Sequence, residues 1–210
     1  QVLIVLNFQI HYCMIDIDVL LSLGATYKKI QAEEVIFTEG KPCFFYHQLV
    51  SGSVRWVNVD DDGNEFIQNV IEPGECFGEM PLFDNGVYAA SAVANTESVI
   101  IRLHRSFFSQ LLMERPDIHL AFSKMMSERL RFKFALLKEL AHHNPEKSIN
   151  TLLSYLKGSK RNICTVCNKV KLTRQQIANM TGLRVETVIR TIRQLHDKGQ
   201  LTIEKGKVYY

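Results

Sequence analysis

The sequence predicts an α+β protein with a β-barrel or sandwich, then one long helix, then a small helical domain that ends in a hairpin. Three observations support this fold class. Between residues 32 and 103, runs rich in Val, Ile and Phe alternate with turn signals at intervals of about 8–12 residues. From residue 106, the apolar residues follow helical spacing over many turns. Near the end, a capped segment, a single glycine and a second apolar stripe precede a Lys-Gly turn.

The composition is that of an ordinary soluble chain, with 210 residues of which 46% are hydrophobic and 22% charged. The charge is uneven along the chain. Residues 145–210 hold 13 Lys or Arg against 4 Asp or Glu, whereas residues 1–144 hold 12 against 18. A C-terminal third this basic favours a polyanionic partner for that part, although a solvated basic surface would have the same composition.

The apolar runs and the cysteines bear on location and membrane contact. No apolar run reaches the roughly 18 residues of a membrane span, and the opening QVLIVLNFQI lacks a basic leader and a cleavage site. The five cysteines are scattered and odd in number. We therefore expect a cytoplasmic protein with reduced thiols and no membrane partner.

The first half is expected to form the β-domain. Residues 13–30 have a helical pattern, with Gly24 as a stop signal. Turn signals then follow at 39–42, 51–53, 60–65, 72–75 and 84–86. The stretch SVRWVNVDDDGNEFIQNVI predicts a hairpin with its turn at Asp62-Gly63.

The long helix carries two apolar stripes, which implies two buried faces. One face would cover the barrel, and a second copy of the same helix is the simplest partner for the other, so we expect a homodimer. The alternative is a helix buried entirely within one chain. The stripe assigned to the dimer helix consists of Ile118, Phe122, Met125, Phe132 and Leu136. A second stripe consists of Met126, Leu130, Leu137 and Leu140.

A domain boundary is expected near residue 144. The segment Asn144-Pro145-Glu146 combines an N-cap, a proline at the first helical position and an acid in the first turn. The chain is thus divided into a β-domain at 1–106, a dimerisation helix region at 107–143 and a C-terminal domain at 144–210.

The C-terminal domain has the pattern of a winged helix-turn-helix. Thr173 and Gln176 form a capping box, and Gly182 permits the tight turn between two helices. The second helix is expected from about Val185 to His196, and LTIEKGKVYY forms a hairpin at its end. Its buried stripe would be Val188, Ile192 and Leu195, which turns Val185, Glu186, Ile189, Arg190 and Arg193 outward.

Glu186 and Arg190 lie one helical turn apart and therefore point the same way. Arginine can donate to guanine O6 and N7, and glutamate can accept from the cytosine amino group. An intrahelical salt bridge is the alternative use of this spacing. We assign base contacts in double-stranded DNA to Val185, Glu186, Ile189 and Arg190. Phosphate contacts are assigned to Thr173, Arg174, Thr187 and Arg193.

The segments EEVIFTEG, GECFGEMPLF and LTRQQIANMTGLRVETVIRTIRQL resemble the cyclic AMP receptor protein and fumarate–nitrate reduction regulator (Crp/Fnr) superfamily over nearly the whole chain. The resemblance implies a cyclic-nucleotide-binding-like β-roll (a jelly-roll barrel), a long dimerisation helix and a winged helix-turn-helix. It also implies a homodimeric transcription regulator that binds an inverted repeat, with half-sites about 34 Å apart, and contacts RNA polymerase. A signal would move the DNA-binding helices about Asn144. VETVIR is closer to the fumarate–nitrate branch than to the cyclic AMP branch.

The effector side departs from the family pattern. Gly78 and Glu79 match it, but Ala89-Ala90 stands where cyclic AMP receptors have the Arg-Ser pair that holds the cyclic phosphate, and Lys133-Phe134 replaces a Thr-Ser pair. Burying a phosphate without its arginine is costly, so we expect an unknown effector other than cyclic AMP. The expected effector pocket consists of Gly78, Glu79, Met80, Tyr88, Ala89, Ala90, Lys133 and Phe134.

No cofactor or metal is predicted. Cys13, Cys43 and Cys76 lack the spacing of an iron–sulfur cluster. Cys164 and Cys167 supply half of the ligands of a structural zinc site, and the pair His142-His143 suits an ordinary helix end. Two alternatives stay open: a haem- or redox-sensing regulator, and a small-molecule-binding signalling module whose C-terminal domain binds protein. No nucleophile–base pair or phosphate loop is present, so an enzyme is not expected.

Overall fold

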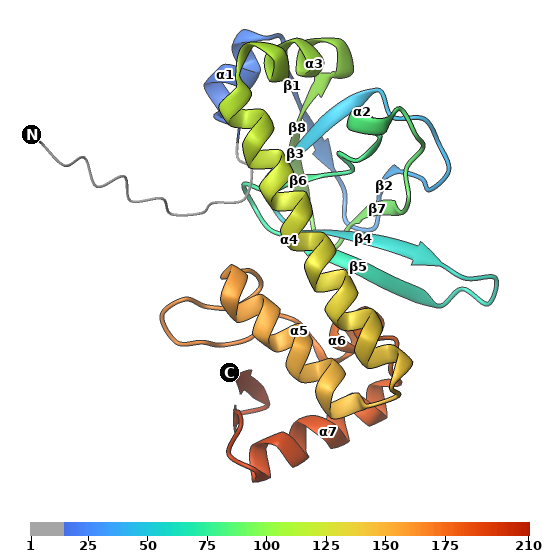
Figure 1. Ribbon diagram of the computed structural model, residues 1–210, viewed down its shortest axis with the longest axis vertical. Helices are drawn as coiled ribbons and strands as arrows, with labels where there is room; N and C mark the ends of the chain where they lie inside the picture. Colours follow the sequence, from blue (N-terminus) through green and yellow to red (C-terminus); the bar gives the residue numbers. More distant parts are fainter. Residues whose placement is uncertain (1–14) are drawn as a thin grey trace, which may run out of the picture.

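The computed structural model describes residues 15–210 and has the predicted α+β architecture (Figure 1). The first half is a β-roll of two four-stranded antiparallel sheets, with strand orders β1-β8-β3-β6 and β2-β7-β4-β5. The strands are β1 Thr26–Ile30, β2 Val35–Phe37, β3 Phe45–Ser51, β4 Val54–Val59, β5 Glu65–Ile71, β6 Cys76–Phe77, β7 Ser91–Ala94 and β8 Ser98–His104. The short helix α2, Pro81–Asp84, lies between β6 and β7.

Local sequence signals explain most of these boundaries. The predicted hairpin is formed by β4 and β5, and Asp60 accepts hydrogen bonds from the backbone N–H groups of Asp62 and Asn64 in its turn. Gly52 has a φ of 93°, and an added Cβ would lie 2.2 Å from Ser98 Oγ, so only glycine fits there.

The helix predicted within residues 13–30 is shorter than expected, although it ends before Gly24 as predicted. Helix α1 spans only Ile17–Ser22, and Gly24 then turns the chain with a φ of 84°. Residues 26–30 form β1 because they pair with the edge of β8, a tertiary contact that overrides the local helical pattern. Residues 13 and 14, including Cys13, lie outside the described residues.

Helices α3, Arg105–Glu114, and α4, Pro116–Ala141, follow the β-roll, and α4 runs diagonally from the roll to the C-terminal domain (Figure 1). The stripe that we assigned to the dimer interface already packs inside this chain. Phe122 and Met125 belong to the core of the roll, Phe132 and Leu136 to the second core, and Ile118 packs at the edge of the first. The face of α4 that is left exposed carries Leu120, Leu130, Phe134 and Leu137. That face, rather than the predicted stripe, is the one available to a second copy.

The C-terminal domain begins after the turn at 142–144, where Asn144 caps the next helix by accepting from Lys147 N–H at 3.0 Å. Its elements are α5 Pro145–Ser159, α6 Arg174–Thr181, α7 Val185–Asp197, β9 Thr202–Glu204 and β10 Lys207–Tyr209. The last two strands form the predicted hairpin.

Two hydrophobic cores hold the chain together. The first fills the β-roll. The second contains Val57, Ile67, Val70 and Val93 from the β-roll together with the interior of the C-terminal domain. The chain turns at 142–144, where a domain boundary was expected, yet this second core crosses that turn. No helix within residues 15–210 combines the length and apolarity that a membrane crossing requires.

Candidate functional site

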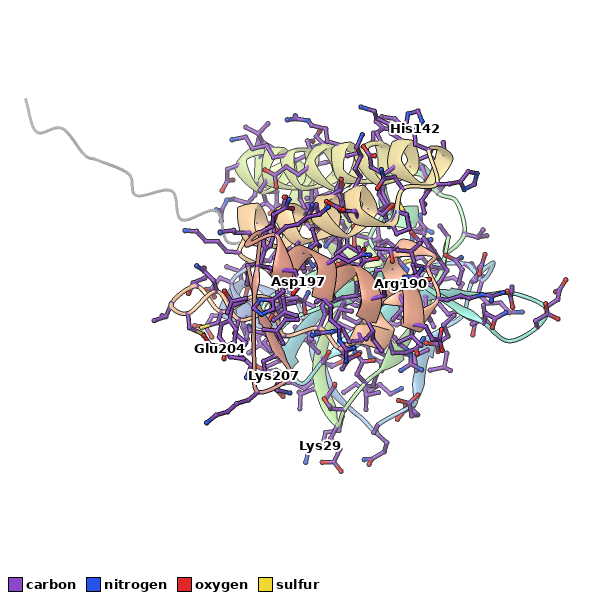
Figure 2. All side chains as sticks on the ribbon, turned by 90° about the horizontal axis from the view of Figure 1, so that it is seen from below. Lys29, His142, Arg190, Asp197, Glu204 and Lys207 are labelled. Atoms are coloured by element: carbon purple, nitrogen blue, oxygen red, sulfur yellow. The ribbon has the colours of Figure 1, made fainter. Side chains whose placement is uncertain are left out.

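Helix α7 presents one buried and one exposed face. Val188, Ile192 and Leu195 are buried against the rest of the domain, as predicted. Glu186, Ile189 and Arg190 are exposed. Figure 2 views the molecule from the α7 end, and Arg190 lies on the side that faces the viewer. The helix is thus held by one face and free to make contacts with the other.

The side chains of Glu186 and Arg190 are uncommitted. In the part of the chain that the structure describes, no hydrogen bond or ion pair engages either of them, so the intrahelical salt bridge is not formed. Val185 is half-buried and packs against the second core, so it offers less surface than expected. Glu186 and Arg190, one helical turn apart, can therefore both form hydrogen bonds with the same bound molecule.

Helix α6, which precedes α7, is fixed at both ends by local chemistry. Thr173 Oγ1 accepts from Gln176 N–H at 3.1 Å, and Gln176 Oε1 accepts from Thr173 N–H at 2.9 Å, which forms the predicted capping box. Gly182 ends α6 in the left-handed region with a φ of 64°. This rigid turn sets the direction in which α7 leaves the domain.

The residues assigned to phosphate contacts lie at the start of α6 and on α7. Thr173 and Arg193 are exposed, whereas Arg174 and Thr187 are half-buried. Burial lowers the pKa of Arg174 from its ordinary value. The N-cap residue of α7, Arg184, is exposed as well and adds a positive charge that the prediction did not include.

The C-terminal domain is docked on the β-roll by a buried ion pair. Arg161 Nη2 donates to Glu75 Oε2 at 2.5 Å, and the two side chains are 3% and 8% exposed. Burial alone would lower the pKa of Arg161, but the Glu75 carboxylate outweighs burial and raises it. Asn162 N–H donates to Glu72 Oε2 at 2.7 Å, and Lys171 Nζ donates to Glu72 Oε1 at 2.6 Å. These three contacts form what we call the interdomain lock.

A second contact between the two parts lies beside α7. The β4–β5 hairpin and the α6–α7 turn together line a cleft of about 600 Å³. Asp60 and Glu65 lie on the hairpin side, and Arg184, Val185 and Glu186 on the other. The start of α7 is therefore close to an acidic hairpin in this arrangement.

A cavity of about 460 Å³, partly open to solvent, lies between the β-roll, α4 and α5. Trp56, Met126, Leu130, Phe132 and Tyr155 provide most of its apolar wall. Its polar wall consists of Gln68, Asn69, Glu79, Arg129 and Lys133. Tyr155 comes from α5 and stacks on Phe132 with ring centroids 3.9 Å apart, so the C-terminal domain forms part of the cavity.

The comparisons with known proteins agree with this architecture. Residues 27–115 match the cyclic nucleotide-binding domain family, and residues 146–209 match the Crp-like helix-turn-helix domain family. The chain is 28% identical over 172 residues to the cAMP-activated global transcriptional regulator CRP of Pasteurella multocida, an alignment that covers 81% of this chain and 82% of that protein. The chain belongs to the Crp/Fnr family of transcription regulators.

Two solved structures share the fold of this chain. FixK2 from Bradyrhizobium japonicum superimposes with a TM-score of 0.72 at 23% identity, covering 88% of this chain and 91% of FixK2. The c-di-GMP responsive regulator CLP from Xanthomonas campestris gives a TM-score of 0.70 at 22% identity, covering 92% and 96%. As a Crp/Fnr protein, this chain is a DNA-binding transcription regulator.

The structure brings five of the expected effector-pocket residues of this Crp/Fnr regulator to the cavity: Glu79, Met80, Ala89, Ala90 and Lys133. The other three lie elsewhere. Tyr88 is buried in the core and stacks on Phe37 at 3.8 Å, and an added Cβ at Gly78 would lie 2.4 Å from the Phe37 ring. Phe134 is 63% exposed because it belongs to the outward face of α4. Gly78, Tyr88 and Phe134 therefore do not line the cavity, contrary to the prediction.

Sequence reasoning missed several cavity residues, among them Trp56, Gln68 and Tyr155. Among the missed cavity residues, only Arg129 had a recognisable sequence signal, because it places a charge between Met125 and Phe132 in the first apolar stripe of α4. It donates to Glu79 Oε1 at 2.5 Å.

The cysteine and histidine pairs form no larger cluster. Cys164 and Cys167 lie in a tight turn in which Cys167 N–H donates to Cys164 Sγ at 3.4 Å. The pKa of the Cys164 thiol is lowered to about 7, first by its hydrogen bond with the Cys167 side chain and then by backbone N–H groups. Between residues 15 and 210, no group of three or more His, Cys, Asp or Glu side chains could hold a metal ion.

Proposed function

We propose that this Crp/Fnr regulator acts as a cytoplasmic homodimer that binds an inverted repeat through α7. Arg190 donates to a guanine and Glu186 accepts from a cytosine, while Ile189 touches a thymine methyl group. The observation that carries this proposal is that Glu186 and Arg190 are exposed and uncommitted on a helix whose other face is buried. Arg193, Arg184 and Thr173 position the helix on phosphates.

The second copy packs on the exposed face of α4. Leu130, Phe134 and Leu137 are each more than half exposed, which is unusual for large apolar side chains on one helix face. Their pairing in a two-fold dimer would place two α7 helices on successive major grooves. RNA polymerase is the expected protein partner of the bound dimer, and an effector other than cyclic AMP changes the arrangement about Asn144.

Paired substitutions on α7 test the base contacts. Arg190→Ala should reduce discrimination against a changed base pair by about 1–3 kcal/mol and leave most non-specific binding intact. Arg193→Ala should weaken binding to all sequences alike, because a phosphate contact carries no sequence information. If both variants lower the affinity equally for all DNA sequences, the assignment of a base contact to Arg190 is wrong.

Salt dependence tests whether the partner is DNA. Binding to a DNA duplex should weaken steeply as salt rises, because neutralising phosphates releases counterions. The Arg193→Ala variant should have a smaller salt slope than wild type, by about one counterion. A salt-independent interaction of the C-terminal domain would instead favour the protein-binding signalling module.

A further inference from the structure

In the cavity between the β-roll and α4, the one positive charge without an acidic partner among the described residues is that of Lys133 on α4. Lys133 Nζ donates to Gln68 Oε1 at 2.6 Å and to the Gln68 carbonyl at 2.9 Å. Burial, followed by repulsion from Arg129, lowers the pKa of Lys133 to about 8. No carboxylate within the described residues forms an ion pair with this ammonium group. Lys133 is therefore a half-buried cation whose hydrogen-bond partners are neutral.

The other charges of the cavity cancel each other. Arg129 Nη1 and Glu79 Oε1 are 2.5 Å apart, and Arg129 Nη2 donates to the Cys76 carbonyl at 3.2 Å. The titratable groups on the wall are then Lys133 and Arg129 from α4, Glu79 from the loop before α2, and Tyr155 from α5. Their sum near neutral pH is one positive charge, contributed by Lys133.

Two buried polar atoms at the same wall lack partners. Glu79 is 1% exposed, and within residues 15–210 neither its Oε2 atom nor Arg129 Nε forms a hydrogen bond. Unsatisfied polar atoms in a buried site are costly, and they are satisfied when a molecule with a donor and an acceptor enters. The cavity thus has unfilled hydrogen-bonding capacity in addition to its charge.

The rest of the wall is apolar and partly aromatic. Trp56 and Phe132 supply flat rings, Met80 and Met126 supply flexible thioethers, and Ala89-Ala90 leaves open space. A volume of about 460 Å³ is suited to a small organic molecule. Ala89 and Ala90 belong to the β-roll, whereas Lys133 belongs to α4. The open space beside the alanines and the positive charge of Lys133 are therefore on different walls of the cavity.

We propose that this cavity binds a small aromatic carboxylate or sulfonate with one negative charge, held by Lys133 on α4, with its apolar body against Trp56 and Ala89-Ala90. The anion replaces the neutral Gln68 contacts of Lys133, and a polar group on the body meets Glu79 and Arg129. This orientation differs from one in which the anion sits at Ala89-Ala90, because these two side chains supply no charge.

The bound molecule also contacts the C-terminal domain. Tyr155 lines the cavity, and its hydroxyl oxygen accepts from Arg161 Nη1 at 3.3 Å. Arg161 belongs to the interdomain lock through Glu75. A ligand that touches Tyr155 therefore binds the docked arrangement better than any arrangement in which α5 has moved away, and it stabilises docking. Ligand binding and its effect on docking do not depend on the proposed function. Only the conclusion that docking regulates DNA binding rests on it.

A pair of matched dyes tests the inference on the full chain. 1-Anilinonaphthalene-8-sulfonate carries one negative charge, and N-phenyl-1-naphthylamine has the same rings without the sulfonate. Lys133→Met should weaken binding of the sulfonate dye roughly tenfold or more and change the affinity for the neutral dye by less than about twofold. The reason is that only the sulfonate interacts with the charge of Lys133. Lys138→Met, which removes an exposed lysine from the same helix, should change neither. Ala90→Leu should weaken the binding of both dyes, because the larger side chain occupies space in the cavity.

The pH dependence provides a second measurement. Sulfonate affinity should be constant from about pH 6 to 7 and fall about tenfold per unit above pH 8.5, as Lys133 loses its proton. Bound sulfonate should also slow amide exchange at Asn162, and Tyr155→Ala should abolish that slowing.

The proposal is overturned if Lys133→Met binds both dyes as wild type does, if Ala90→Leu binds both unchanged, or if neither dye binds wild type. It is also overturned if cyclic AMP displaces the sulfonate dye at equal concentration. None of these measurements involves DNA, so their failure is separate from a failure of the proposed DNA contacts.

Discussion

Removing the charge of Glu75 should release the C-terminal domain from the β-roll. The Arg161 side chain is only 3% exposed, and the Glu75 carboxylate raises its pKa. Glu75→Gln removes that carboxylate and leaves a buried guanidinium without its charged partner. Breaking one side of a buried pair costs about 3–5 kcal/mol. Because the two partners lie on opposite sides of the turn at 142–144, we expect much of this cost to fall on the docked arrangement. The docking equilibrium would then shift by roughly 10²–10³.

Amide hydrogen exchange measures this shift directly. Asn162 N–H donates to Glu72 across the interface, so its exchange reports docking. In Glu75→Gln it should exchange about 100-fold faster, while the amides of β3 and β8 inside the roll keep their protection. The matched control is Lys171→Met, which removes an ion pair from the same interface whose lysine is 54% exposed. An exposed pair contributes about 0–1 kcal/mol, so the control should change exchange less than about fivefold. If Glu75→Gln behaves like the control, the buried pair does not hold the domains together.

Three further predictions concern separate parts of the molecule. Alkylation of Cys164 should reach its maximal rate near pH 8 because its pKa is lowered to about 7, and a rate that still rises tenfold per unit at pH 9 would contradict this. Leu137→Glu should turn a dimer into a monomer in analytical ultracentrifugation, whereas Met113→Glu, at an exposed apolar residue of α3, should leave the mass unchanged. Gly182→Ala should lower the free energy of unfolding by about 1 kcal/mol, because its φ of 64° disfavours a side chain; an unchanged denaturation midpoint would refute this.

Features set by neighbouring residues were predictable from the sequence. The capping box of Thr173 and Gln176, the N-cap at Asn144 and the turn at Gly182 each depend on contacts within a few residues. The buried stripe of α7 followed from its period alone. These signals were sufficient for the C-terminal domain and its exposed helix face.

Features that depend on distant residues were missed or misplaced. The periodicity of α4 identified two stripes, but it could not say which one packs on its own chain, and the dimer assignment of Phe132 was wrong for that reason. The partners Arg161 and Glu75 are 86 residues apart, and neither local pattern marks them as a pair. Tyr155 reaches the cavity only because the second core joins α5 to the β-roll.

The cavity and the interdomain lock share residues, and this sharing constrains how a signal can act. The docked arrangement is held by a buried ion pair, whereas the stacking of Tyr155 on Phe132 adds only about 0.5–1.5 kcal/mol. A ligand that merely disturbed that stacking could therefore not undock the domain. A ligand that binds the cavity can strengthen docking, by as much as its affinity for the docked arrangement exceeds its affinity for the undocked one. Reciprocity then requires that Glu75→Gln, which disfavours docking, also weakens the sulfonate dye once the undocked form predominates. An unchanged dye affinity in a variant whose Asn162 amide exchanges freely would show that the cavity and the lock are independent.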